Sequence, residues 1–330
     1  MINNILIRDN SKPLLHPGLC GEMDALFLEQ KKEWGLLNQK FGNLSSVQVK
    51  EFIIDGVDVK LQFNPDRIHS TSADIDKHLV MPKECFLCAD NRPKEQRGIQ
   101  YGKQFELLCN PYPILPDHYT VVKLKHTSQS LVLHLKEFLN ISADLGEKFT
   151  LFYNGPRCGA SAPGHMHFQA ITRGVLPIEN DFENLRKDFI TSRFSDEKLS
   201  VNLSMNYLRY FITVESSSIK EIVLFFKTLN IILKKLTTPG HEPLMNVLAN
   251  YDNEMWRLII FPRARHRPSH YFASGDKQIV VSPAAVDLGG LMITPRKEDF
   301  EKITPGDVKE IFRQVTVTKE MFEYLLKKLT

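Results

Sequence analysis

The chain has 330 residues, of which 42% are hydrophobic, 25% charged and 10% aromatic. These values lie close to the averages for globular proteins and exclude disordered, collagen-like and coiled-coil classes. Lys and Arg number 42 against 39 Asp and Glu, so the net charge of +3 is too small to make nucleic acid or an anionic membrane the expected partner. At roughly 150 residues per domain, the length predicts two domains or one duplicated domain.

The expected compartment follows from the N-terminal residues and from the cysteines. The start, MINNILIRDNSKPLL, has no basic stretch followed by a long apolar one, and apolar runs such as 222–226 are far shorter than the ~18 residues of a membrane span. Five cysteines are an odd number for a disulfide framework and favour a reducing compartment. We therefore expect a cytoplasmic protein with no export signal and no membrane partner.

The N-terminal half predicts a lead-in helix, a hairpin and an α+β unit. Residues 22–41 have apolar residues at near-helical spacing, and two β-rich runs, 47–54 and 57–63, flank Asp55-Gly56, a pair typical of hairpin turns. A loop with the sequence CFLC follows. The pattern then predicts strand, helix, strand and strand at 119–124, 129–145, 149–153 and 165–171.

The same order of elements returns in the C-terminal half. After a charged connector at 179–200, the pattern predicts a strand, a helix and two strands at 207–214, 217–236, 245–250 and 255–261. A strand at 278–282 and a final helix at 306–328 complete the chain. A repeat of this length predicts an α+β fold built from a duplicated unit, as two antiparallel-sheet lobes with helices packed against them. The expected domains are the helical lead-in 1–45, a lobe 46–178 and a second lobe 179–330.

The most informative motif is YNGPRCGASAPGHMHFQ at residues 153–169. On a strand, alternation places His165, His167 and Gln169 on one face and leaves Met166 and Phe168 facing the core. The small residues before the strand let backbone N–H groups approach an anion; they include Gly155, Gly159 and Gly164.

An imidazole beside such a loop suggests covalent catalysis on phosphorus. A neutral His167, with its other ring nitrogen held by a backbone carbonyl, would attack an α-phosphorus and form a phosphoramidate that a second acceptor resolves. Gln169 would hold a phosphate oxygen without adding charge. The alternative is a buried strand that carries two satisfied histidines.

The motif resembles the active site of the histidine-triad (HIT) superfamily, in the branch where HxHxQ replaces HxHxH. This branch includes galactose-1-phosphate uridylyltransferase, diadenosine tetraphosphate phosphorylase (ATP adenylyltransferase) and GDP-L-galactose phosphorylase. The resemblance implies a duplicated HIT-like unit and nucleotidyl transfer through a nucleotidyl-histidine. It implies that His167 is the nucleophile and that Gln169 and Ser161 bind phosphate. It also implies that Asn154 and the backbone of Gly159 and Ala160 line the nucleotide site.

One departure concerns the serine. Ser161 lies four residues before His165, whereas the serine of the uridylyltransferase and adenylyltransferase motifs lies three residues before the first histidine. The role of Ser161 therefore follows less directly from the resemblance.

A second constellation is Cys85-x-x-Cys88 together with His126 and His165. The histidines lie far from the cysteines in sequence, so no local zinc-finger spacing applies, although tetrahedral zinc takes two cysteines and two histidines that converge in space. The alternatives are a redox pair and two reduced core thiols. The resemblance implies that these residues hold a structural metal, and we expect zinc.

Further candidates carry weaker signals. QFNPDR at 62–67 resembles a segment of GDP-L-galactose phosphorylases and places Asn64 and Arg67 near substrate, with a strand-end turn as the alternative. His118 matches the histidine that opens a strand of HIT proteins. A basic run after residue 261 would hold a distal phosphate or form a solvated loop; it consists of Arg263, Arg265, His266 and Arg267.

The resulting expectation is a nucleotidyltransferase or phosphorylase that acts on an NDP-sugar or a dinucleoside polyphosphate and passes the NMP to phosphate or a sugar phosphate. The GDP-hexose phosphorylase, ATP adenylyltransferase and hexose-1-phosphate uridylyltransferase types stay open. The second lobe has Leu258 and Ile260 in place of histidines, so we expect it to be catalytically silent. The alternatives are a non-catalytic nucleotide-binding or sensing protein and a zinc-dependent nucleic-acid binder, the latter opposed by the small charge. HIT-like units often pair, so a homodimer is also open.

Overall fold

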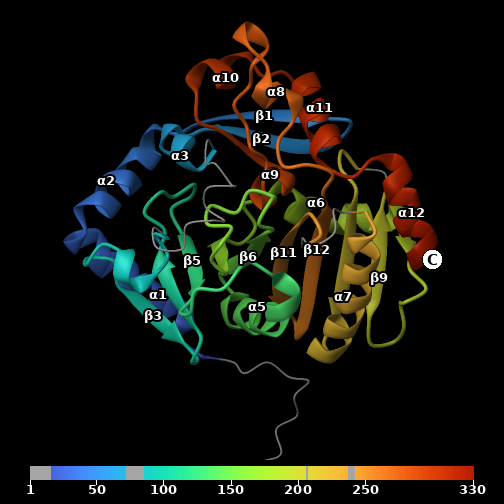
Figure 1. The fold of residues 1–330 in the computed structure, drawn as a ribbon, viewed down its shortest axis with the longest axis horizontal. Coiled ribbons are helices and arrows are strands. Elements are labelled where there is room, and N and C mark those ends of the chain that lie inside the picture. The colour runs from blue at the N-terminus through green and yellow to red at the C-terminus, as the bar shows by residue number, and fades with distance from the viewer. Residues whose placement is uncertain (1–15, 72–84, 206, 237–241) are drawn as a thin grey trace, which may run out of the picture.

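The computed structural model describes residues 16–71, 85–205, 207–236 and 242–330. Within them, ten strands form one antiparallel sheet that crosses the whole molecule in the order β3-β4-β5-β7-β6-β11-β12-β10-β9-β8 (Figure 1). The strands are β3 (Gly98–Tyr101), β4 (Phe105–Cys109), β5 (His118–Lys123), β6 (Phe149–Asn154), β7 (His167–Thr172), β8 (Phe189–Thr191), β9 (Ser200–Ser204), β10 (Phe211–Ser216), β11 (Met245–Asp252) and β12 (Met255–Pro262).

The sheet contains the predicted duplication. The first unit orders its strands β3-β4-β5-β7-β6, and the second unit repeats this order as β8-β9-β10-β12-β11. Helix α5 (Leu131–Leu145) joins β5 to β6, and α7 (Ile219–Lys234) joins β10 to β11. The units meet where β6 pairs antiparallel with β11, with Asn154 opposite Asn246. The α+β fold with a duplicated unit is confirmed, and the sheets of the two lobes are continuous.

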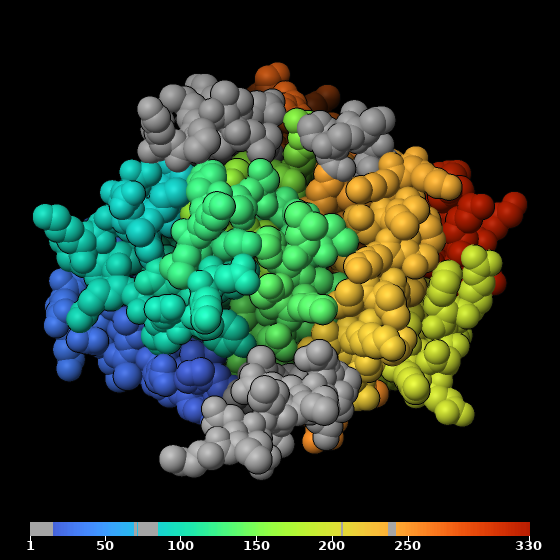
Figure 2. Space-filling view, turned by 60° about the horizontal axis from the view of Figure 1, so that its bottom comes forward, coloured from blue at the N-terminus to red at the C-terminus, as the bar shows by residue number. Residues whose placement is uncertain are grey.

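The large sheet separates two hydrophobic cores. On one face, α5 and α7 lie side by side with α1 (Leu19–Glu33) and α12 (Lys319–Leu329), and they bury residues such as Phe138 and Phe226 (Figures 1 and 2). The other face packs against a second, three-stranded sheet. That sheet contains β1 (Gln48–Ile54), β2 (Val57–Phe63) and β13 (Leu291–Thr294).

Helices cover the second core as well. They are α6 (Pro177–Leu185), α9 (Ala285–Leu288), α10 (Lys297–Lys302) and α11 (Pro305–Val315). Phe152 and Ile171 point from the large sheet into this core, and Gln169 lies on the same face as Ile171 because side chains alternate along a strand. The polar row of the HxHxQ motif therefore faces the second core.

Local sequence signals explain several element ends. Asp55 and Gly56 take positive φ values of 52° and 80°, which gives the hairpin between β1 and β2 the predicted tight turn. Asn253 and Glu254 do the same between β11 and β12, with φ of 48° and 60°. At the start of α7, the side chain of Ser218 accepts a hydrogen bond from the N–H of Glu221 and caps the helix.

Two predicted helices are wrong in their length because each is broken in the structure. The helix expected at 22–41 is divided into α1 and α2 (Gly35–Asn43) by Trp34, whose extended backbone lets its side chain enter the core at 4% exposure. The helix expected at 306–328 is divided into α11 and α12. The second helix begins after Thr318, whose side chain accepts a hydrogen bond from the N–H of Met321 and caps the N-terminus of α12.

The strand predictions also need correction. Residues 278–282 form no strand, because the N–H of Val280 donates to the Asp299 carboxylate at 2.9 Å instead of to a neighbouring strand. The expected connector 179–200 contains most of α6 and all of β8. The strands expected from 165 and 207 begin at His167 and Phe211. The sequence prediction missed β3, β4, β9 and β13.

Two expectations about chain organisation stay predictions. The expected domain limit at 45 lies close to the start of β1, and the limit at 178 lies inside α6. Residues 1–15, which include the N-terminus expected to lack an export signal and part of the expected lead-in, lie outside the described residues. In the described part of the chain, no helix is long and apolar enough to cross a membrane.

Trp256 gives a test of how the two units depend on each other. Its fully buried side chain lies on β12 of the second unit, and its indole N–H donates to the carbonyl of Leu139 in α5 of the first unit at 2.8 Å. Trp256→Ala leaves a large cavity, so we expect the free energy of unfolding to fall by about 3 to 5 kcal/mol in urea titrations. Leu133→Ala, at a 74% exposed position on α5, serves as the control and changes it by about 0.5 kcal/mol or less. Equal effects would contradict the proposed dependence.

Candidate active site

A cavity of about 580 Å³ opens on the second-core face of the first unit. Aromatic side chains contribute to its wall; they are Trp34, Phe86, Tyr112 and Phe152. Nine of the candidate residues line it: Arg67, His118, Asn154, Gly159, Ala160, Ser161, Gln169, His266 and Arg267. A concave, largely apolar cavity of this size with a few convergent polar groups is typical of small-molecule sites.

His167 lies on the same strand face as Gln169 but is not part of the cavity wall, and its side chain is 1% exposed. Its Nδ1–H donates to the carbonyl of His165 at 2.8 Å, which leaves the lone pair on Nε2. Among the described residues, Nε2 is buried with no hydrogen-bond partner. Burial lowers the pKa of His167 to about 4, so the ring is neutral at neutral pH.

Gln129 holds the backbone at His167. Its side-chain oxygen accepts from the N–H of His167 at 2.8 Å, and its amide nitrogen donates to the carbonyl of His167 at 2.9 Å and to the carbonyl of Asn154 at 3.0 Å. The buried amide thus joins the ends of β6 and β7 where regular pairing between them stops. No sequence motif indicated this role of Gln129.

Gln169 is oriented by His118. The N–H of Ile114 donates to Nδ1 of His118 at 3.3 Å, so Nε2 carries the proton and donates to Oε1 of Gln169 at 2.8 Å. The amide nitrogen of Gln169 is then the end available to the cavity. Burial, with a smaller effect from Arg67, lowers the pKa of His118 to about 3, which keeps this ring neutral.

The glycine-rich loop packs closely against the second unit. Gly159 has φ of 90°, and a Cβ there would lie 2.6 Å from Cβ of Ala284; at Gly155 it would lie 2.9 Å from the carbonyl oxygen of Met245. No larger residue fits either position without a shift of the neighbours. These two glycines are therefore required by packing between the units, in addition to letting the backbone of residues 159–161 line the cavity.

The predicted metal ligands converge. The ligand atoms of Cys85, Cys88, His126 and His165 all lie within 4.8 Å of one another. Nδ1 of His165 is 3.2 Å from Sγ of Cys85 and 3.5 Å from Sγ of Cys88, and Nδ1 of His126 is 3.2 Å from Sγ of Cys88.

These positions fit a tetrahedral ion. With bonds of about 2.0 to 2.3 Å from a central zinc, nitrogen and sulfur ligands lie only a little farther apart than these distances. The Nε2–H of His165 donates to the carbonyl of Lys123 at 2.6 Å, which turns Nδ1 toward the thiols and is the usual outer contact of a metal-bound histidine. The cluster could therefore hold a metal, and it adjoins His167 because its ligand His165 lies two residues before the start of β7.

The segment at 62–67 divides into one structural residue and one cavity residue. Asn64 is 3% exposed; its amide nitrogen donates to the carbonyl of Pro113 at 3.1 Å, and its oxygen accepts from the N–H of Asp66 at 3.2 Å. Asn64 thus holds the turn that follows β2 and does not reach the cavity. Arg67 lines the cavity, and one guanidinium nitrogen donates to the carbonyl of Tyr112 at 3.3 Å.

The basic run also divides. Arg263 is 2% exposed and donates to protein oxygens, among them the carbonyls of Val315 and Pro283, so it is not a phosphate ligand in this structure. Arg265 is exposed, whereas His266 and Arg267 line the cavity. Ser282 accepts from Nε of Arg267 at 3.2 Å and lies 2.9 Å from Nε2 of His266. The alternative of a wholly solvated loop is wrong.

Other cavity residues carried no sequence motif. Asp287 is 7% exposed, and its carboxylate accepts from the N–H groups of Ala284 and Ile293; burial raises its pKa to about 6. Asp287 and Ser282 come from a segment after the second unit that folds back over the first. Only their tertiary position identifies them.

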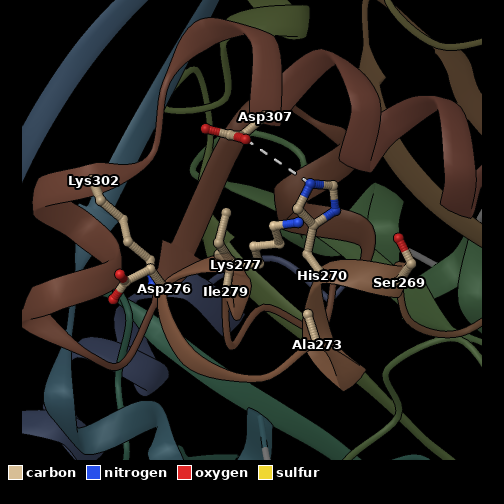
Figure 3. A pocket seen from close by; sticks show the side chains of 8 residues that line it. All are labelled: Ser269, His270, Ala273, Asp276, Lys277, Ile279, Lys302 and Asp307. Atoms are coloured by element: carbon tan, nitrogen blue, oxygen red, sulfur yellow. Dashed lines mark ion pairs between the residues drawn. The ribbon is translucent and has the colours of Figure 1, made fainter.

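Another cavity, of about 500 Å³, lies among α8 (Ser269–Phe272), α10 and α11 (Figure 3). Nε2 of His270 lies 3.9 Å from a carboxylate oxygen of Asp307, and Lys277 and Lys302 also line this cavity (Figure 3). None of the predicted site residues is in its wall.

Comparisons with known proteins agree with this architecture. Residues 26–172 match the domain of unknown function DUF4922, and residues 180–330 match the GDPGP1-like C-terminal domain. No curated protein sequence matches the chain.

The fold is similar to crystal structures of yeast Ap4A phosphorylase Apa2. The TM-score is 0.60 at 15% identity, over 86% of this chain and 96% of that one. The Ap4A complex gives 0.59 at 16% identity over 92% and 98%, and the AMP complex gives 0.53 at 16% identity over 87% and 96%. The duplicated fold is therefore shared with these structures, and in this chain His167 and Gln169 of the HxHxQ motif lie on its strand β7.

The depressed pKa of His118 predicts a pH dependence of stability. In the unfolded chain this histidine binds a proton as the pH falls below about 6.5, whereas in the native state it stays neutral until about pH 3, so stability is lost as the pH falls through this window. Between about pH 7 and pH 5 the expected loss is roughly 2 kcal/mol. His118→Gln removes this contribution, and urea titrations across the window measure the difference. Parallel curves for the two proteins would show that the ring is not held neutral.

Proposed function

We propose that this protein is a nucleotidyltransferase or phosphorylase that works through a nucleotidyl-histidine on His167. The observation that carries the proposal is Nε2 of His167. It is a neutral, buried nitrogen with a lone pair and no partner among the described residues, and its tautomer is fixed by a backbone carbonyl. Buried polar atoms without partners are rare and call for a functional explanation.

The proposed reaction has two displacements. Nε2 of His167 forms a bond to the α-phosphorus, and the bond from that phosphorus to the bridging oxygen breaks, so the rest of the donor leaves as a phosphate-bearing anion. An oxygen of inorganic phosphate or of a sugar phosphate then attacks the same phosphorus, and the bond to Nε2 breaks. The amide nitrogen of Gln169 and the loop at 159–161 would hold phosphate oxygens, and Arg67 would attract the anionic donor.

The cavity supports a nucleotide as the donor. Aromatic side chains of its wall offer surfaces on which a base can stack, and Arg67, Arg267 and the amides of Asn154 and Gln169 line the same cavity. Crystal structures of the similar yeast phosphorylase hold AMP and Ap4A. We propose both dinucleoside polyphosphates and NDP-sugars as donor classes. In the present conformation the ring of His167 is not open to the cavity, so attack also requires rearrangement of the groups around it.

The adduct itself is the test. We expect intact-protein mass spectrometry, after incubation without acceptor with UDP-glucose, GDP-mannose, GDP-L-galactose or diadenosine tetraphosphate, to show the added mass of UMP, GMP or AMP. His167→Ala abolishes the adduct, whereas His270→Ala, in the cavity of Figure 3, retains it. An adduct that persists in His167→Ala would overturn the covalent mechanism. Nucleotide binding without any adduct would favour the non-catalytic binding protein.

We propose zinc as the ion of the Cys85, Cys88, His126 and His165 cluster. Zinc fits two thiolates and two imidazoles, and there it would tie the loop at residue 85 to the strand end that carries His167. Its contribution would be structural, since all four ligand positions come from the protein.

Metal analysis tests this assignment. We expect about one zinc per chain in purified protein, and Cys85→Ser to lower both the zinc content and the free energy of unfolding, the latter by roughly 4 kcal/mol. Cys20→Ser changes a half-buried thiol outside the cluster and retains the metal. Wild-type protein without a stoichiometric metal, or a Cys85→Ser protein as stable as wild type, would contradict the zinc proposal.

A further inference from the structure

Asn154 lies beside the proposed nucleophile. The pairing of β6 with β7 ends with Phe152 opposite Gln169, and beyond it the amide of Gln129 bridges the carbonyls of Asn154 and His167. Asn154 and His167 therefore lie at neighbouring ends of the two strands, joined by this amide. Since Asn154 lines the cavity, a donor on its side chain is placed to reach an oxygen of a phosphate bound there.

The amide of Asn154 has only one orientation that satisfies its neighbours. Its oxygen accepts from the amide nitrogen of Asn246 at 2.7 Å and from the N–H of Ala285 at 2.9 Å. Both lone pairs of this oxygen are then used, and both donors belong to the chain beyond the first unit. Because Asn154 lines the cavity, its amide nitrogen is the end that faces the ligand.

Asn246 is oriented in turn by Arg263. The oxygen of Asn246 accepts from a guanidinium nitrogen of Arg263, and its nitrogen also donates to the carbonyl of Cys158 at 2.8 Å. An arginine side chain only donates hydrogen bonds, so Asn246 must turn its oxygen to Arg263 and its nitrogen to Asn154. All three side chains are at least nine-tenths buried, which makes an incorrect orientation costly.

Arg263 is fixed by oxygens of the C-terminal part of the chain. Its guanidinium donates to the carbonyls of Val315, Pro283, Arg265 and His266 at 2.9 to 3.1 Å. Because the guanidinium is used by these contacts, Arg263 does not bind a ligand itself. The contacts also fix which group donates and which accepts in the hydrogen bonds that connect Arg263, Asn246 and Asn154.

We propose that Arg263 and Asn246 are positioning residues, which act through Asn154 by turning its amide nitrogen toward a non-bridging oxygen of the reacting phosphate. This rests on the proposed function. The second unit has no histidine in the place of His167, yet it supplies the side chain that orients a substrate-binding residue of the first. We expected the second lobe to be catalytically silent. By this proposal the lobe supplies no nucleophile, but it determines which end of the Asn154 amide faces the ligand.

Asn246→Asp reverses this polarity with almost no change in volume. The new carboxylate keeps its contact with Arg263, and its second oxygen requires a donor, so the amide of Asn154 turns its nitrogen away from the cavity and its oxygen toward the phosphate. The loss of one such donor costs a factor of roughly 100 to 1000 in other enzymes. We expect the single-turnover rate of adduct formation to fall by a factor of this order. The urea midpoint also falls, because the new carboxylate faces the carbonyl of Cys158 and the N–H of Ala285 loses its acceptor.

The control variant is Asn202→Asp, which makes the same change at a buried asparagine of β9 in the second unit, outside the cavity. It should retain the wild-type rate. A double-mutant cycle with Asn154→Ala then separates positioning from general structural damage. If Asn246 acts through Asn154, Asn246→Asp has little further effect on the rate once Asn154 is alanine; two independent losses would overturn the proposal.

The failure of the proposed function is distinguishable from the failure of this inference. If wild type forms the adduct and Asn246→Asp forms it equally fast, the positioning role is wrong and the function stands. If wild type forms no adduct, the proposed function fails, and the cycle is measured as the dissociation constants of AMP, GMP and UMP. Should Asn246→Asp not fold, Asn246→Ala enters the same cycle, with a smaller loss expected because Ala285 still holds the oxygen of Asn154.

Discussion

The antiparallel pairing of β6 with β11 is the contact on which the rest of this structure depends. It joins two five-stranded units into one sheet and places Asn154 opposite Asn246 at the end of the first unit. A hairpin edge left unpaired here would expose backbone groups and remove the packing partner of the glycine-rich loop. The same pairing brings Met245 and Ala284 close to Gly155 and Gly159, so the shape of the site is decided at the junction between the units.

The polar side chains of the site are all oriented by a hydrogen bond to a neighbouring group. Each side chain that is proposed to face the substrate has its other end bound to a neighbour: His167 to a backbone carbonyl, Gln169 to His118, and Asn154 to Asn246. Since these groups are buried, the energetic cost of an unpaired or reversed hydrogen bond is large enough to fix a single orientation. The site is therefore organised in the absence of ligand, apart from the opening that His167 requires.

Neutrality is the second common property. Burial depresses the pKa values of His118, His167 and His266 to about 3 or 4, so that none of these imidazoles is charged at neutral pH. Positive charge at the cavity comes instead from Arg67 and Arg267. This combination suits the proposed attack on a phosphorus that carries negative oxygens, because the arginines of the cavity would offset the charge while a neutral imidazole keeps its lone pair.

The sequence by itself determined the repeated unit and the hairpin at Asp55-Gly56, because these depend on periodicity and turn chemistry. The convergence of the cysteine and histidine cluster was predicted from the resemblance to the HIT superfamily and not from spacing. The sequence also singled out His167, Gln169 and the loop before them, whose spacing on one strand fixes a shared face. Only the tertiary structure decided that the two sheets are one, that Asn64 and Arg263 are structural, and that Asn246, Asp287 and Gln129 belong to the site. These roles depend on which residues distant in sequence become neighbours, and a buried amide or carboxylate carries no local pattern that reveals its partner.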